Sequence, residues 1–226
     1  MAAGWYDHDW PELPEIEMLR GRTLRRGARV FDIGAHHSVV ALMLAREVGP
    51  AGQVIAVEAN PHNAASAARN CKLNQASQVE VLQAAASNRE GQVVFNEGLD
   101  GQLDDGSGAG GRMTVDAVTL DGLAARYGRP DVVFLDVEGA ECLVLAGGPL
   151  VLAGGADLAI EVHVNTGLEK LGGSVERLLA FLPASRYKVL VRAESDTQFR
   201  SLAEGDALLQ ERCFLLALFQ IRQVPS

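Results

Sequence analysis

The stretch VFDIGAHHSVVAL, residues 30–42, decides the fold of this chain. Its first four residues are mostly apolar and short enough for a buried strand, and Gly34 follows them at a turn. Gly34 and Ala35 carry almost no side chain, so the backbone there can approach a ligand closely. Ser38 is placed to satisfy the amides that open a helix. Alone, the stretch fits either an anion-binding turn or an ordinary strand-to-helix connection.

Apolar strands and helices alternate on both sides of this stretch. A first helix is expected over residues 12–24, and the helix after Ser38 is expected to end at Val48. The alternation predicts a doubly wound α/β fold, a mostly parallel sheet with helices on both faces and right-handed crossovers. Further strands are predicted at 53–58, 79–86, 92–96, 131–136, 157–163, 187–192 and 212–219, and further helices at 61–73, 119–127 and 174–182.

Length and composition indicate one domain over residues 1–226. Within it we expect an N-terminal leader and helix over 1–27 and a mobile loop, rich in Gly and Asp, over 97–112. A net charge of −9 disfavours nucleic acid and anionic membranes as partners. Three widely spaced cysteines without a CxxC pair suggest no zinc site and fit a reducing compartment. With no basic, apolar signal peptide and no apolar run of ~20 residues, the sequence predicts a cytoplasmic protein.

Polar groups close several of the predicted strands. In doubly wound sheets the ligand lies beyond the carboxyl ends of the strands, so these groups are candidates for function. They are Asp32, Glu58, Asp136 with Glu138, and Glu161 with His163.

Glu58 suggests a nucleoside ligand, because a carboxylate at the end of the second strand can accept both ribose hydroxyls. A strand-end salt bridge is the alternative. Dinucleotide sites use GxGxxG, whereas this turn has only Gly34, preceded by Asp32. S-adenosylmethionine has no pyrophosphate, and an acidic residue near the first turn can face its positive charges.

Several segments taken in order resemble the FkbM-type S-adenosylmethionine-dependent methyltransferases. They are VFDIGAHHSVVAL, VIAVEANPHNAASAARNCKLN, TLDGLAARYG, VVFLDVEGAE and IEVH, and the match spans residues 30–163. The resemblance implies the class I methyltransferase fold, a Rossmann-like sheet of seven strands whose last strand is antiparallel. It also implies methylation of a hydroxyl oxygen on a saccharide or natural product.

The resemblance also implies which residues hold the methyl donor. Residues 32–38 read DIGAHHS where the family usually has DxGANxG, so His36 stands at the usual Asn and Ser38 at the usual second Gly. We expect both to donate hydrogen bonds to the donor's carboxylate. The full expected donor site is Asp32, Gly34, Ala35, His36, Ser38, Glu58, Ala59 and Ala84.

The acids and the histidine at the later strand ends suit methyl transfer to an alcohol, which requires removal of the hydroxyl proton. His163 follows Glu161 by two residues, so on a strand both side chains share a face. We predict His163 as the general base; a buried histidine satisfied by a neighbour is the alternative. VFLD is similar to the corresponding strand of catechol O-methyltransferases, where an acid binds magnesium. That similarity implies Mg²⁺ on Asp136 and Glu161; the alternative is that these acids orient the substrate and the base. Glu138 either shares the metal or forms a hydrogen bond to the loop.

Two other functions remain open at the level of sequence. One is an NAD-linked oxidoreductase, which the missing glycines disfavour. The other is a noncatalytic protein that binds S-adenosylmethionine or a partner, which the set of polar strand ends argues against. The expected partner is a small-molecule or saccharide acceptor, and a homodimer is left open.

Overall fold

The computed structural model describes residues 12–96, 102–103 and 111–220. Its main sheet has eight strands in the order β11-β10-β12-β9-β8-β1-β2-β3. Seven of them match the expected sheet, and the eighth, β11 (Arg200–Ser201), pairs along the edge of β10 (Tyr187–Ala193). The predicted class is therefore confirmed, including the antiparallel β12 (Cys213–Phe219).

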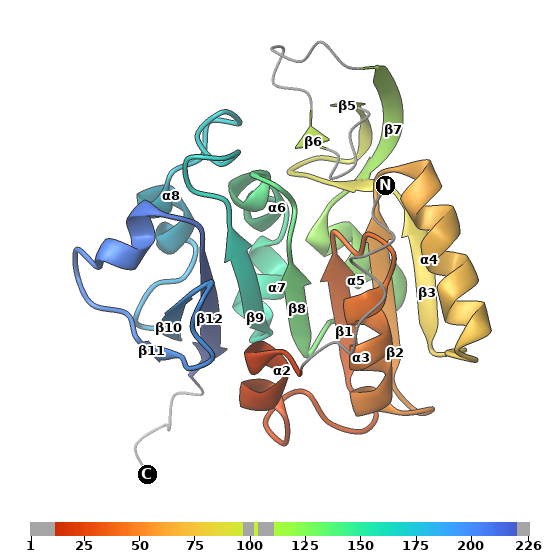
Figure 1. Ribbon diagram of the computed structural model, residues 1–226, viewed down its shortest axis with the longest axis horizontal. Helices are drawn as coiled ribbons and strands as arrows, with labels where there is room; N and C mark the ends of the chain where they lie inside the picture. The colour runs from red at the N-terminus through yellow and green to blue at the C-terminus, as the bar shows by residue number, and fades with distance from the viewer. Residues whose placement is uncertain (1–11, 97–101, 104–110, 221–226) are drawn as a thin grey trace.

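The centre of the sheet is parallel. β1 (Arg29–Ile33) lies between β2 (Gln53–Glu58) and β8 (Val132–Leu135), and Asp32 is in register with Ala56 and Phe134. β3 (Val79–Gln83) extends the sheet beyond β2, and β9 (Asp157–Val162) lies between β8 and β12. The parallel strands therefore end along one edge of the sheet (Figure 1), the edge at which ligands bind in doubly wound sheets.

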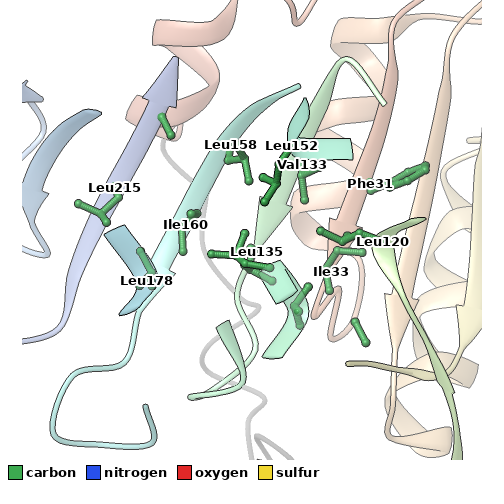
Figure 2. Packing of buried hydrophobic residues seen from close by; sticks show 14 of the residues in the cluster. Phe31, Ile33, Leu120, Val133, Leu135, Leu152, Leu158, Ile160, Leu178 and Leu215 are labelled. Atoms are coloured by element: carbon green, nitrogen blue, oxygen red, sulfur yellow. The ribbon is translucent and has the colours of Figure 1, made fainter. Parts of the chain in front are cut away.

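Helices cover both faces of the sheet. On one face, α2 (Pro14–Leu19) and α3 (Val39–Val48) pack on alternate strand residues such as Val30 and Val54. α4 (Pro61–Leu73) lies beside α3 over β3 (Figure 1). The opposite face carries α5 (Leu120–Tyr127), α6 (Glu141–Ala146), α7 (Pro149–Gly154) and α8 (Val175–Ala180). Figure 2 shows how Phe31, Val133 and Ile160 of the sheet meet Leu120 and Leu178 of these helices.

A second, smaller sheet stands above the strand ends and has the order β4-β7-β5-β6 (Figure 1). Its strands are β4 (Ala85–Ala86), β5 (Gly91–Asn96), β6 (Gln102–Leu103) and β7 (Arg112–Val118). Ala85, Phe95 and Val115 form its small buried core. A short 3₁₀ helix, η1 (Ala207–Gln210), precedes β12.

Three local expectations differ from the structure. The first helix covers Pro14–Leu19 rather than 12–24, because the backbone leaves the helix at Arg20 and Gly21 takes a φ of 76°. The strand expected over 79–86 is divided between β3 and β4. Of the loop expected over 97–112, residues 102–103 form β6 and Arg112 begins β7; residues 97–101 and 104–110, like leader residues 1–11, lie outside the described residues.

Candidate active site at the strand ends

The turn after β1 is held between two neighbouring strands. The amides of Gly34 and Ala35 donate to the Val57 carbonyl at 2.9 and 3.0 Å. Gly34 has a φ of 90°, and an ideal Cβ at this position would lie 1.7 Å from the Asp136 carbonyl oxygen. The position therefore requires glycine, both for its backbone conformation and for its contact with the end of β8.

His36 and Ser38, the two departures from the family motif, have left-handed backbone, with φ of 47° and 65°. Asn and Gly adopt this conformation at lower cost than His and Ser do. Ser38 forms no side-chain cap on α3, so the expected capping role is wrong. The left-handed backbone of Ser38 differs from the extended backbone of a typical capping residue. Its buried Oγ has no hydrogen-bond partner among the described residues.

Glu58 connects the turn after β1 to the turn after β2. Its two carboxylate oxygens accept the amide hydrogens of His36 and Asn60, each at 2.8 Å. These partners are backbone amides, rather than the cationic side chain of a strand-end salt bridge. Burial raises the pKa of Glu58 even though both amides favour the charged form.

Asp32 lies near the end of β1, close to Glu58. Its Oδ2 is buried and has no hydrogen-bond partner among the described residues. Burial, with a contribution from the charge of Glu58, raises the pKa of Asp32 to about 7. Ala84 is buried and donates its amide to the Glu58 carbonyl at 3.0 Å, while half-buried Ala59 packs on the core of the small sheet. All the residues predicted to hold a methyl donor therefore lie around the ends of β1, β2 and β3.

The acids and the histidine also meet. Nε2 of His163, just beyond β9, is 3.6 Å from Asp136 Oδ1, 3.3 Å from Glu138 Oε2 and 3.7 Å from Glu161 Oε1. Asp136, Glu161 and His163 each offer one ligand atom, and these atoms lie within 4.8 Å of one another. The predicted convergence on one face is thus present, with His163 buried below a half-exposed Asp136.

Charges within this cluster depend strongly on one another. Burial alone would lower the pKa of His163, but the carboxylates of Glu138 and Glu141 outweigh it and raise that pKa to about 10. Protein atoms crowded around the carboxylate and the charge of Glu161 raise the pKa of Asp136 above its ordinary value. Burial also opposes ionisation of Glu138, but contact with His163 lowers its pKa overall. The carboxylates around the ring therefore favour the protonated form of His163.

Two members of the site were not predicted from sequence. Glu141 is fully buried, with Oε1 2.7 Å from His163 Nδ1. Its one signal was its place in DVEGAE, which the family resemblance includes without indicating its role. Arg212 pairs with Glu161 from the start of β12, and nothing in the local sequence brings these distant residues together.

The turn over residues 34–38, here called the donor turn because it is expected to hold the methyl donor, lies next to the acidic cluster of Asp136, Glu138, Glu161 and His163. The two adjoin where Gly34 meets the Asp136 backbone. A polar hollow lined by Gly27, Arg29 and Asp131 lies at the opposite ends of the strands and includes none of the predicted site residues.

Among the described residues, no helix has the length and apolar character needed to cross a bilayer.

Comparison with protein families gives a match to the methyltransferase FkbM domain over residues 32–189. No curated protein matches the sequence. Among solved structures, the methyltransferase FkbM from Methylobacillus flagellatus KT is similar, with 18% identity and a TM-score of 0.56. That match covers 91% of this chain but 48% of the other.

Two further solved structures share the fold. A SAM-dependent O-methyltransferase from Thermotoga maritima has 15% identity and a TM-score of 0.55, over 99% of this chain and 72% of the other. A SAM-dependent methyltransferase from Aquifex aeolicus has 16% identity and a TM-score of 0.50, over 94% and 95%. The family match favours a methyltransferase over an NAD-linked oxidoreductase.

Proposed function

The chain belongs to the FkbM methyltransferase family, and we propose that it transfers a methyl group from S-adenosylmethionine to a hydroxyl oxygen of a saccharide or another natural product. One observation carries the proposal for oxygen as the acceptor atom. A histidine and carboxylates converge at the strand ends, next to the turn expected to hold the donor. The net charge of −9 supports a small-molecule acceptor over nucleic acid.

The residues at the first turn fit the methyl donor. Asp32 Oδ2 and Ser38 Oγ are buried polar atoms without partners among the described residues, so both are available to a polar ligand. Gly34 keeps the turn free of a side chain, and Glu58 retains lone pairs for ribose hydroxyls beyond the two amides that it accepts. When bound, S-adenosylmethionine supplies a methyl group activated by its sulfonium charge. We also propose that the bound donor contacts Ala35, His36, Ala59 and Ala84.

His163 is the proposed general base. Its Nε2 is buried without a hydrogen-bond partner among the described residues and points toward the half-exposed Asp136, while Nδ1 is occupied by Glu141. With the ring neutral, an acceptor hydroxyl placed at Nε2 can transfer its proton to the imidazole, and a bound Mg²⁺ that offsets the carboxylate charges would favour that neutral form. The surrounding carboxylates stabilise the imidazolium that results, which is the same effect that raises the pKa of His163.

Asp136 and Glu161, with Glu138, are the proposed ligands of Mg²⁺. Carboxylate oxygens are the ligands that this cation prefers, and a bound cation lowers the pKa of a coordinated hydroxyl. It would also offset the negative charges that keep His163 protonated. Arg212 forms an ion pair with Glu161 in the structure, so Mg²⁺ would have to compete with Arg212 for this carboxylate.

The test is methyl transfer from labelled S-adenosylmethionine to a panel of saccharides and polyhydroxylated natural products, with Mg²⁺ present. We expect a product with an O-methyl group. His163→Ala should lower kcat by about 10²–10⁴-fold, the usual contribution of a general base. Its affinity for S-adenosylhomocysteine, measured by calorimetry, should stay unchanged because His163 lies outside the donor turn.

His62→Ala is the matched control, because His62 is exposed on α4 and takes no part in the cluster. Full turnover in His163→Ala would exclude His163 as the base. Excess chelator should abolish activity and added Mg²⁺ should restore it; undiminished activity in chelator removes the cation from the mechanism. A methyl group found on nitrogen or carbon would overturn the proposed acceptor atom.

A further inference from the structure

Glu141 is a buried carboxylate behind the proposed base. It opens α6, and its side chain is 0% exposed, while that of His163 is 1% exposed. Oε1 of Glu141 lies 2.7 Å from Nδ1 of His163, the shortest of the contacts between this imidazole and an acidic side chain in the described structure. The other three acids approach Nε2, on the opposite side of the ring. Glu141 is therefore separate in position from the carboxylates that face the open side of the cluster.

The direction of this hydrogen bond follows from a third group. The amide of Gly139 donates to the same Oε1 atom at 3.0 Å. An oxygen that accepts from an amide and also lies 2.7 Å from a ring nitrogen is best satisfied as the acceptor of both hydrogens. Nδ1 is then the protonated nitrogen, and in the neutral imidazole the lone pair lies on Nε2, toward the acids.

The backbone around the pair is tightly packed. An ideal Cβ on Gly139, whose φ is 109°, would lie 2.3 Å from the Gly167 carbonyl carbon. The loop after β8 therefore rests directly on the loop after β9. The His163 carbonyl also accepts the amides of Gly167 and Leu168, each at 3.1 Å. These contacts leave little freedom for Glu141 and His163 to separate.

We propose that Glu141 is a positioning residue that holds the His163 ring by Nδ1, so that Nε2 is presented to the acceptor hydroxyl. The inference rests on the proposed role of His163. A carboxylate that only filled space in the core would not need to bond the ring nitrogen and the Gly139 amide through one oxygen. Glu141 itself touches neither donor nor acceptor in this arrangement.

The test compares two substitutions in protein labelled with ¹⁵N-histidine. Glu141→Gln retains a carbonyl oxygen that can accept from both Gly139 and Nδ1, whereas Glu141→Met is similar in size and has no comparable acceptor. We expect a slowly exchanging, downfield proton on His163 Nδ1, assigned by its absence in His163→Ala. It should be present in the native protein and in Glu141→Gln, and lost in Glu141→Met.

Activity provides the second readout, with the acceptor found in the panel above. Glu141→Met should lower kcat by about 10–100-fold, in the range seen when a group that orients a histidine is removed. The KM for S-adenosylmethionine should not change, and Glu141→Gln should stay within about tenfold of the native kcat. This difference separates positioning from simple core packing, since both variants fill the site.

Failure of this inference can be told from failure of the proposed function. If His163→Ala is inactive while Glu141→Met keeps native kcat, the positioning role is wrong and the base assignment stands. If His163→Ala is fully active, the proposed base is wrong whatever Glu141 does. Absence of the Nδ1 proton in the native protein overturns the inference even if Glu141→Met fails to fold.

Discussion

Asp32 is a buried acid that costs stability at the proposed donor site. It lies in β1 beneath the donor turn, and one of its oxygens has no hydrogen-bond partner among the described residues. Burial, assisted by the charge of Glu58, raises its pKa to about 7 from an ordinary value near 4. The folded protein therefore holds a proton on Asp32 over a range of pH where the unfolded chain has lost it.

We predict that this group makes the ligand-free protein less stable as pH rises from about 4 to about 7. The folded state binds more protons in this window, so the free energy of unfolding falls with pH, by about 4 kcal/mol for a shift of this size. Asp32→Asn should remove this component, because the amide does not titrate. Urea unfolding of both proteins at several pH values measures it, and parallel profiles would contradict the prediction.

At the residue scale, the sequence predicted which side chains gather at the strand ends better than it predicted how they pair. Asp136, Glu161 and His163 could be chosen because each follows or closes an apolar strand, and parallel strands end together. Glu141 could not be given a role, because its partner is 22 residues away and the bond depends on how two loops pack. The left-handed backbone at His36 and Ser38 likewise had no local signal beyond the departure from the family motif.

At the scale of elements, the donor turn depends on close contact with the neighbouring strand. Gly34 and the Asp136 backbone touch where β1 and β8 end, so one glycine lies between the donor site and the acidic cluster. A side chain here would have to move the turn, the end of β8, or both. Either movement displaces residues from both halves of the proposed site.

Gly34→Ala should therefore lower the free energy of unfolding by about 3 kcal/mol and weaken the binding of S-adenosylhomocysteine. The added Cβ meets the Asp136 carbonyl oxygen and also makes the left-handed backbone costly. Gly27→Ala is the matched control: φ at Gly27 is 82°, but an added Cβ would meet no atom within 4 Å. Equal losses in the two variants, measured by urea unfolding and calorimetry, would show that the contact with β8 contributes nothing.

Most elements could be predicted because their hydrophobic patterns are local. The helix at Pro61–Leu73 matches its predicted bounds, and Thr119 and Ser174 cap the two later helices. β7 was missed although Met113, Val115 and Ala117 alternate with polar residues, because the segment directly follows the Gly- and Asp-rich stretch that was assigned to a loop; β7 pairs with β5. The division at Ala84 depends on a second sheet that the sequence did not predict.

At the scale of the whole molecule, one ion pair joins segments far apart in the chain. Arg192 of β10 donates from Nε and Nη2 to Glu15 Oε1 of α2, at 2.8 and 2.6 Å. Glu15 is 4% exposed and Arg192 5%. The guanidinium also lies over the Phe214 ring, 3.7 Å from its centroid. This cluster attaches the first described helix to strands β10 and β12.

Glu15→Ala should destabilise the fold by about 3–5 kcal/mol, because it leaves the Arg192 charge buried without its partner. Glu17→Ala is the control: Glu17 is an exposed residue of the same helix, and its loss should change stability by at most about 0.5 kcal/mol. Urea unfolding at neutral pH compares them. A loss in Glu15→Ala no larger than in Glu17→Ala would mean that the helix is attached by its apolar residues alone.

The position of β12 has a consequence for the order in which the molecule can be assembled. β12 follows β9 and β10 in the chain, yet it lies between them and pairs with both. Until residues 213–219 have left the ribosome, the nascent sheet has a gap flanked by two unpaired strand edges. Such edges are sites of association between chains. The sheet is completed only after β9, β10 and β12 have all been synthesised, and until then the strand edges that β12 will pair with are open to association.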